Sequence, residues 1–142
     1  MSDTVNPKIF RAYDIRGIYP QDLNEAAAYK IGRAFAIYVK RNEVPTPEKI
    51  IIGRDARLSS QILSRSIISG AADDGINVCD IGLSTVDMVY FASGYFHCPA
   101  VMITASHNPK KWNGFKLMKS NVEFFNVEKL ASEVVTGAVG SK

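Results

Sequence analysis

The sequence has few cysteines, no long apolar run and little net charge, and each of these shortages excludes a class of protein. Its two cysteines lack the spacing of a metal site and are too few for a disulfide framework. We therefore expect two reduced thiols in a cytoplasmic protein. No apolar run could span a membrane, the N-terminus lacks the apolar core of a signal peptide, and the net charge is only +3. These features predict neither a membrane partner nor a nucleic-acid partner.

Three motifs that often mark enzymes or nucleotide sites are also absent. The chain has no GxSxG nucleophile elbow, no GxGxxG fingerprint and no GxxxxGKS or GxxxxGKT loop. Its histidines are His97 and His107, and His107 directly follows Ser106. A histidine next to the serine in the sequence is poorly placed to accept a hydrogen bond from the Ser106 hydroxyl, as a catalytic base must. The sequence therefore disfavours a serine hydrolase triad and gives no support to a nucleotide site.

The composition that is present fits one soluble globular domain. Of the 142 residues, 46% are hydrophobic and 22% are charged. These are ordinary values for a folded chain, and the length is sufficient for a real core. We expect a single domain over residues 1–142, with residues 1–7 and 137–142 as flexible tails.

Strand-like and helix-like patterns alternate along the chain. We expect strands at 8–16, 49–53, 76–81, 100–104 and 115–118, and helices at 22–41, 59–75, 85–95 and 126–136. Asp22 should cap the first helix, Ser59 or Ser60 the second, and Asn113-Gly114 should form a turn. The order predicts an α/β fold of three layers, with a mainly parallel sheet and helices on both faces. The strand at 115–118 would fold back as one antiparallel edge strand.

The run TASHNP at 104–109 contains the strongest candidate for chemistry. Ser106 follows an apolar strand, and open α/β proteins place their sites at the carboxyl ends of strands. The next stretch supplies four lysines and no acid before Glu123. A phosphoserine carries a charge near −2 and needs nearby cations. The pattern therefore indicates a serine that handles phosphate, although serine is also common as a simple turn residue.

Four motifs stand in order along the chain: FRAYDIRG at 10–17, GRDAR at 53–57, TASHNP at 104–109 and NGFK at 113–116. Through them nearly the whole chain resembles the first domain of the α-D-phosphohexomutases, in particular the bacterial phosphomannomutase/phosphoglucomutase group. The resemblance implies that Ser106 carries a phosphoryl group and donates it to a phosphorylated hexose. The resulting hexose 1,6-bisphosphate, which also acts as activator, returns its other phosphoryl group to Ser106. Hexose 1-phosphate and hexose 6-phosphate are thereby interconverted.

The resemblance also implies roles for the residues around Ser106. Lys116 is similar to the family's general acid/base, and His107 to the histidine that assists proton transfer. Arg16 is similar to the arginine that holds the phosphoryl group, while Tyr13 and Asn108 would contact the substrate. Mg²⁺ would bind an oxygen of the phosphoserine.

Simpler interpretations of some of these residues stay open. Lys116 alternates with apolar residues and could be the solvated face of a strand. Arg16 could form a surface ion pair with Asp14. Arg54 and Arg57 could hold the loop network or a domain contact, and we place neither in the catalytic set.

The family's enzymes have four domains, and this chain resembles the first. It contains no DGDxDR-like run, which supplies the metal-ligating carboxylates in the family. We therefore expect the chain to be the N-terminal domain of a phosphohexomutase acting on mannose phosphate, glucose phosphate or both. The remaining three domains would be its partners, and the domain alone would be inactive. The alternative is a free-standing domain that binds a phosphorylated ligand or a partner without catalysis.

Overall fold

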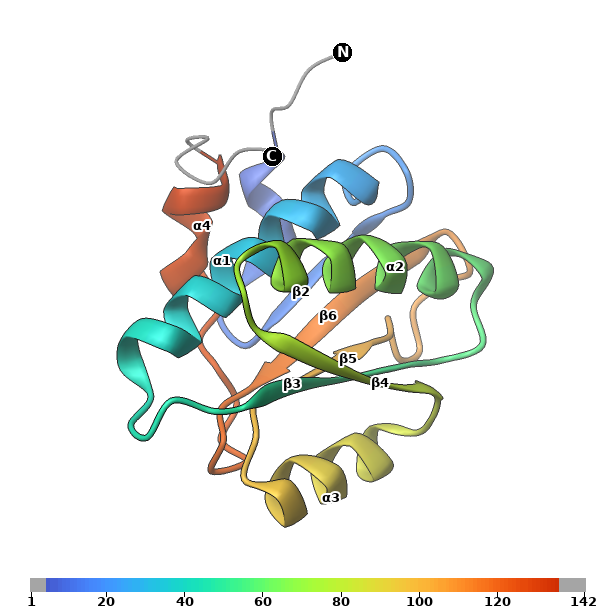
Figure 1. The fold of residues 1–142 in the computed structure, drawn as a ribbon. Helices are drawn as coiled ribbons and strands as arrows, with labels where there is room; N and C mark the ends of the chain where they lie inside the picture. Colours follow the sequence, from blue (N-terminus) through green and yellow to red (C-terminus); the bar gives the residue numbers. More distant parts are fainter. Residues whose placement is uncertain (1–4, 136–142) are drawn as a thin grey trace.

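A computed structural model describes residues 5–135, except for the side chains of residues 132, 133 and 135 (Figure 1). After a short 3-10 helix at Pro7–Ile9, the elements are β1 Phe10–Arg11, β2 Asp14–Ile18, α1 Glu25–Asn42, β3 Lys49–Arg54, α2 Leu58–Asp73, β4 Asn77–Leu83, α3 Val86–Phe96, β5 Ala100–Ile103, β6 Trp112–Met118 and α4 Glu128–Val135. Within the described residues, no helix combines the length and the apolarity that a membrane crossing requires.

The strands form one mixed sheet in the order β1-β2-β6-β5-β3-β4. The strands β5, β3 and β4 run parallel, whereas β6, β2 and β1 are joined by antiparallel pairings. The predicted α/β class, with helices on both faces, is confirmed, and the predicted mainly parallel sheet is a mixed sheet whose core strands are parallel. The position of the last strand was predicted wrongly: β6 pairs antiparallel with β5 as expected, but it is not an edge strand, because β2 pairs with its other side.

The Asn113-Gly114 pair does not form the predicted turn, because both residues lie inside β6. A Cβ added at Gly114 would lie 2.1 Å from the Ile15 carbonyl oxygen of β2. The glycine therefore serves the close approach of two strands rather than a turn conformation. The chain reverses earlier, in the loop of residues 104–111.

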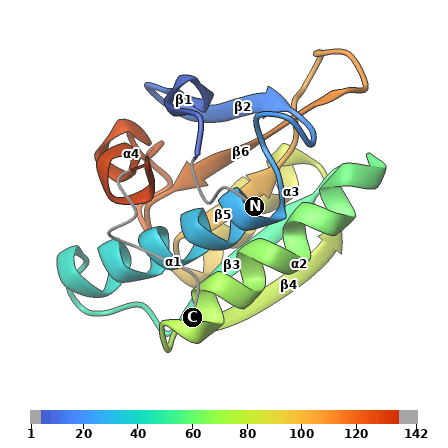
Figure 2. The same cartoon turned by 90° about the horizontal axis from the view of Figure 1, so that it is seen from above.

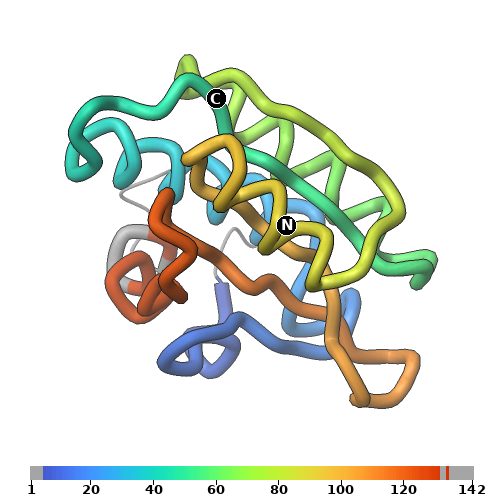
Figure 3. Tube along the Cα trace, turned by 90° about the horizontal axis from the view of Figure 1, so that it is seen from below, coloured from blue at the N-terminus to red at the C-terminus, as the bar shows by residue number. Residues whose placement is uncertain are grey.

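Helices cover the two faces of the sheet unequally (Figures 1 and 2). The helices α1 and α2 pack against each other over one face, where the larger apolar core lies. On the other face α3 packs against β3 and β5 over a smaller apolar cluster. Figure 3, seen from below in relation to Figure 1, shows β2 and β6 to one side of α3. This half of the face carries the candidate site.

The first helix begins two residues later than Asp22 would place it. Its N-cap is Asn24, whose side chain accepts a hydrogen bond from the Ala27 amide at 2.9 Å. The carboxylate of Asp22 is instead used in tertiary contacts, accepting from the Asn6 amide at 3.0 Å and from the Ile18 backbone N–H at 3.3 Å. A long-range role thus replaces the predicted capping role.

The predicted tails lie mostly outside the described residues, which exclude 1–4 and 136–142. Residues 5–7 are not a loose tail, because Val5 is only 3% exposed and Asn6 caps the 3-10 helix. At the other end, the Asn126 side chain accepts from the Glu128 amide at 3.0 Å, at the start of α4. The predicted end of that helix at residue 136 lies outside the described residues.

Candidate active site

Ser106 lies in the loop that joins β5 to β6, three residues after the end of β5. The last ladder contact before the loop runs from the Thr104 N–H to the Gly114 carbonyl at 2.9 Å. Ser106 then donates its backbone N–H to the Thr104 hydroxyl at 3.0 Å and adopts a left-handed conformation with φ of 54°. Such a conformation costs about 1–2 kcal/mol for a residue with a side chain. The residue is exposed, whereas the preceding Ala105 is fully buried.

The turn behind Ser106 is closed by Asn108. The backbone N–H and the side-chain amide of Asn108 both donate to the Ala105 carbonyl, at 3.0 and 2.8 Å. His107, between the two, is exposed. The structure thus presents Ser106 and His107 together at the surface of a tightly bonded turn. Their predicted chemical roles stay predictions.

Lys116 and Arg16 lie on neighbouring strands beside this loop. In the sheet, Lys116 is the partner of Met102, and Arg16 is the partner of Gly114. The residues that alternate with them, such as Phe115, are buried in the core beneath α1 and α2. By the two-residue period of strands, Lys116 and Arg16 therefore point to the opposite face. Both are half-buried there.

Arg16 forms the ion pair that the sequence left open as an alternative. Its Nε lies 2.5 Å from a carboxylate oxygen of Asp14, and the two side chains are 27% and 19% exposed. The contact engages Nε, so the two terminal nitrogens lie outside this ion pair and can donate to phosphate oxygens. The ion pair is thus compatible with a second, anionic partner for Arg16.

Tyr13 lies in the turn before β2 and is 59% exposed.

Arg57, which sequence reasoning left outside the catalytic set, contacts the serine loop directly. Its guanidinium donates to four carbonyls of the loop and of its junction with β6, called the loop carbonyls below: those of Pro109, Trp112 and Asn108 at 2.8 Å and that of Ser106 at 3.0 Å. The GRDAR motif was the only signal in the sequence that pointed to it. Of the two roles considered there, the loop network is the one that these bonds support.

Asn113 ties β6 to the start of α2. Its fully buried side chain donates to the hydroxyls of Ser59 and Ser60 at 2.7 and 2.9 Å and accepts from the Gly114 N–H at 2.8 Å. The two serines therefore do not cap α2 as predicted, since they bind Asn113 instead. The N-cap position falls to Arg57, which makes no capping bond through its side chain.

Positive charge gathers around the serine loop. Lys110 and Lys111 are exposed on the loop itself, and the Arg11 guanidinium lies 5.7 Å from the ring centre of Trp112. Next to Trp112 is a cavity of about 330 Å³, which Arg11 and Arg16 line together with Lys8, Asp22 and other residues. A hollow with three cations and one acid in its wall favours a small anionic group.

The described residues do not provide a complete Mg²⁺ site. Among residues 5–135, no three His, Cys, Asp or Glu side chains are grouped so as to hold a metal ion. Two acids belong to the site motifs: Asp14 is paired with Arg16, and Asp55 with Arg57. Because Mg²⁺ needs several oxygen ligands, the described residues alone do not complete a coordination shell for it.

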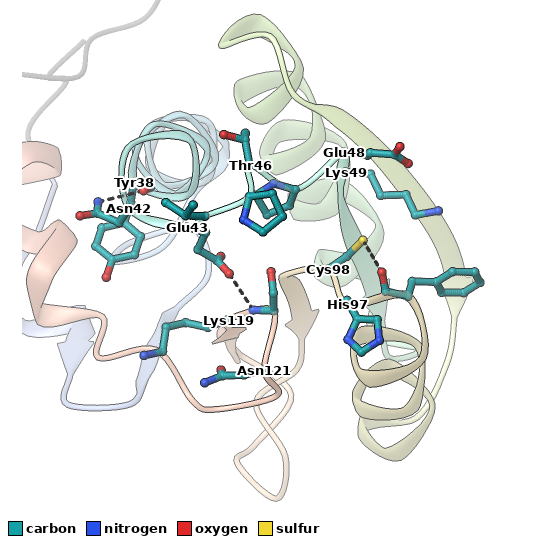
Figure 4. A pocket seen from close by; sticks show the side chains of 15 residues that line it. Tyr38, Asn42, Glu43, Thr46, Glu48, Lys49, His97, Cys98, Lys119 and Asn121 are labelled. Atoms are coloured by element: carbon teal, nitrogen blue, oxygen red, sulfur yellow. Dashed lines mark hydrogen bonds between the residues drawn. The ribbon is translucent and has the colours of Figure 1, made fainter.

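A separate cavity of about 670 Å³ opens at the other end of the strands, near Lys49 and Lys119 (Figure 4). In its wall Glu43 accepts a hydrogen bond from the Ser120 N–H at 3.1 Å. Burial raises the pKa of the Cys98 thiol, which also lines it. Its wall combines acids and bases, so it favours neither sign of charge, and it lies away from Ser106.

Comparisons with known proteins agree with the motifs. Residues 7–134 match the family described as phosphoglucomutase/phosphomannomutase, alpha/beta/alpha domain I. Over 117 residues the chain is 44% identical to a phosphomannomutase of Escherichia coli, which covers 80% of this chain and 24% of that protein. A phosphoglucomutase of Neisseria gonorrhoeae is also 44% identical over 117 residues, with 81% and 25% covered. The chain therefore spans about a quarter of the length of these two relatives.

A shorter relative and a crystal structure extend the comparison. A phosphomannomutase of Klebsiella pneumoniae is 44% identical over 117 residues, which cover 69% of its length. The crystal structure of a phosphoglucomutase/phosphomannomutase family protein from Burkholderia thailandensis superposes with a TM-score of 0.84 at 28% identity, covering 97% of this chain and 32% of that one. Sequence and fold thus agree over most of the described residues, and the chain belongs to the phosphoglucomutase/phosphomannomutase family as its alpha/beta/alpha domain I.

Proposed function

We propose that this chain is the phosphoryl-carrying domain of an enzyme that interconverts hexose 1-phosphate and hexose 6-phosphate. The observation that carries the proposal is Ser106 itself. It is exposed, held in a left-handed turn at the carboxyl end of β5, and set among cations, in a chain whose relatives are named phosphomannomutase and phosphoglucomutase.

The reaction transfers a phosphoryl group between two oxygens. The bond from phosphorus to Ser106 Oγ breaks as a sugar hydroxyl forms its own bond to phosphorus. The hydroxyl loses its proton to Lys116, and the serine oxygen that leaves phosphorus takes up a proton with the help of His107; both proton movements reverse when the direction reverses. Transfer of this kind depends mainly on positioning and on charge stabilisation. The second transfer, from the hexose 1,6-bisphosphate back to Ser106, repeats the step with the sugar reversed.

The other side chains stabilise charge and hold the substrate. Arg16 binds the phosphoryl group through its terminal nitrogens while Asp14 fixes the direction of its side chain. Tyr13 and Asn108 contact the substrate at the edges of the site. Mg²⁺, when bound to an oxygen of the phosphoserine, would supply further neutralisation of charge, with its remaining ligands provided from outside the described residues.

The remaining domains of a longer enzyme are the proposed partners of this chain. The outer face of α3 supports this proposal, because Phe91 and Tyr95 are 70% and 67% exposed and stack on each other with ring centres 5.7 Å apart. Exposed apolar patches of this kind often mark interaction surfaces. Because the sugar-binding and metal-binding parts lie in those domains in the family, the isolated chain should show no mutase turnover.

A domain replacement tests the proposal. Residues 7–134 would replace the matching quarter of the Escherichia coli phosphomannomutase, and the chimera would be assayed with mannose 1-phosphate and glucose 1-phosphate. We expect turnover that is lost in the Ser106→Ala variant, with the isolated chain inactive. A chimera that unfolds cooperatively like the parent enzyme but does not turn over either substrate would contradict the proposal, as would full activity of the Ser106→Ala variant.

A further inference from the structure

Arg57 joins α2 to the serine loop, and the reaction described above gives it no task. A guanidinium has five N–H donors in one plane. The two terminal nitrogens of Arg57 donate to the four loop carbonyls named above. Its Nε lies 3.4 Å from a carboxylate oxygen of Asp55. Every nitrogen of the guanidinium thus has a partner, and four of the five contacts hold the serine loop.

The place of Arg57 in the chain breaks a local preference. It is the N-cap of α2, where Ser, Thr, Asp and Asn are favoured. Its backbone is fixed by Asp55, whose carboxylate accepts from the Arg57 N–H at 3.1 Å and from the Ser60 hydroxyl at 2.5 Å. A residue that violates a local preference is expected where function requires it. Here the requirement is on the side chain, which must reach the loop.

The four carbonyls belong to residues on both arms of the turn, and one of them is that of Ser106. A left-handed conformation is unfavourable for serine, so the surrounding contacts must hold it, and Arg57 adds a contact from outside the loop to the hydrogen bonds within it. The guanidinium draws the Ser106 carbonyl toward α2, whereas the residue itself stays exposed. We propose that Arg57 is a positioning residue, which keeps Ser106 in the conformation from which its oxygen transfers the phosphoryl group. This inference rests on the proposed function, because that reaction gives the orientation of Ser106 its purpose.

The first test measures the loop without reference to catalysis. The backbone amides of Ser106, Asn108 and Trp112 are bonded within the loop, so their hydrogen exchange reports on its opening. In the 142-residue chain, Arg57→Ala should accelerate their exchange by at least about tenfold, the effect of losing one hydrogen bond to a charged group. Arg57→Lys should behave similarly, because a lysine cannot satisfy four carbonyls in one plane. Arg65→Ala, at an exposed arginine of the same helix, is the matched control and should have no effect.

Two further measurements separate positioning from general stability. The amides of β3 should keep their exchange rates if the fold is intact, and they serve as the internal reference. Methylguanidinium, at a concentration that does not unfold the wild-type chain, should slow loop exchange again in Arg57→Ala but not in Arg57→Lys, where the lysine side chain occupies part of the space. In the chimera described above, Arg57→Ala should lower kcat by at least about tenfold with a smaller change in KM, and methylguanidinium should restore part of kcat.

Each outcome bears on a different claim. Unchanged hydrogen exchange of the loop amides in both Arg57 variants would show that Arg57 does not hold the loop, whatever the activity of the chimera. Faster loop exchange with unchanged kcat would overturn the positioning role and leave the proposed function standing. If loop exchange accelerates but the folded wild-type chimera is inactive, the proposed function fails, and the positioning role of Arg57 fails with it.

Discussion

Replacing Gly114 with alanine should force β2 away from β6 and destabilise the fold. A Cβ at this position would lie 2.1 Å from the Ile15 carbonyl oxygen and 3.3 Å from the Arg16 Cα. Real Cβ atoms do not come closer than 3.0 Å to such atoms, so the two strands must separate. The obstacle is backbone, which cannot turn aside as a flexible side chain could.

The size of the effect follows from that separation. Arg16 and Gly114 are direct partners in the ladder between β2 and β6. Overpacking a tight site costs about 1–3 kcal/mol, and each of one or two ladder hydrogen bonds stretched by the shift adds about 1 kcal/mol. We therefore expect Gly114→Ala to lower the free energy of unfolding by about 2–5 kcal/mol. The shift would also carry Arg16 away from the serine loop.

Urea unfolding followed by circular dichroism measures this change. Gly94→Ala is the matched control, because a Cβ there meets only the end of the Val122 side chain, at 3.2 Å. Gly94 lies in α3, where alanine is favoured over glycine by about 0.5–1 kcal/mol. The control should therefore change stability by no more than about 1 kcal/mol. The reasoning is refuted if Gly114→Ala is as stable as this control.

Two other substitutions probe the interior. Asn113→Ala removes the buried amide that binds two serine hydroxyls of α2, and should cost about 1–3 kcal/mol in the same urea assay; a loss below about 0.5 kcal/mol would contradict its bridging role. Because burial raises the pKa of the Cys98 thiol, iodoacetamide should alkylate the half-buried Cys79 first, as mass spectrometry can follow. A raised folded-state pKa favours the neutral thiol, so its stabilisation is present below the unfolded pKa of about 8.5 and is lost as the pH rises through the folded pKa. As the pH rises above about 8.5, the free energy of unfolding should therefore fall less steeply in Cys98→Ala than in the wild type. Equal slopes would show that the Cys98 thiol does not contribute to this pH dependence.

Patterns that depend on burial predicted the fold well. Ile50, Ile51 and Ile52 form a continuous apolar run, and each is only 1% exposed in a strand with neighbours on both sides. Helical periodicity likewise placed the four helices to within a few residues. Burial leaves a regular trace in the sequence, because it repeats with the period of the element.

Residues with several possible uses were predicted less well. Asn-Gly favours a turn and aspartate favours an N-cap, yet Gly114 serves strand contact and Asp22 binds Asn6 and Ile18. In each case a contact with another segment, Gly114 with β2 and Asp22 with Asn6, determines the role of the residue, and local preferences do not take such contacts into account. The basic residues that follow Ser106 in the sequence led to the prediction that it handles phosphate, and this role stays a prediction.

The sequence suggested the loop network as one of two roles for Arg57, but it could not identify the atoms that Arg57 contacts. Its four acceptors are backbone carbonyls, which every residue possesses, so the loop sequence contains no sign of its partner. The motif around Arg57 drew attention to the segment without revealing its contact. Only the folded arrangement brings α2 against the loop.

The most direct test of the central claim is the mass of the chimera after incubation with glucose 1,6-bisphosphate and Mg²⁺. If Ser106 is the phosphoryl carrier, the folded chimera should gain one phosphoryl group, located in the peptide that contains Ser106, and Ser106→Ala should gain none. The account is contradicted if the folded wild-type chimera stays unmodified, or if the added mass persists in Ser106→Ala.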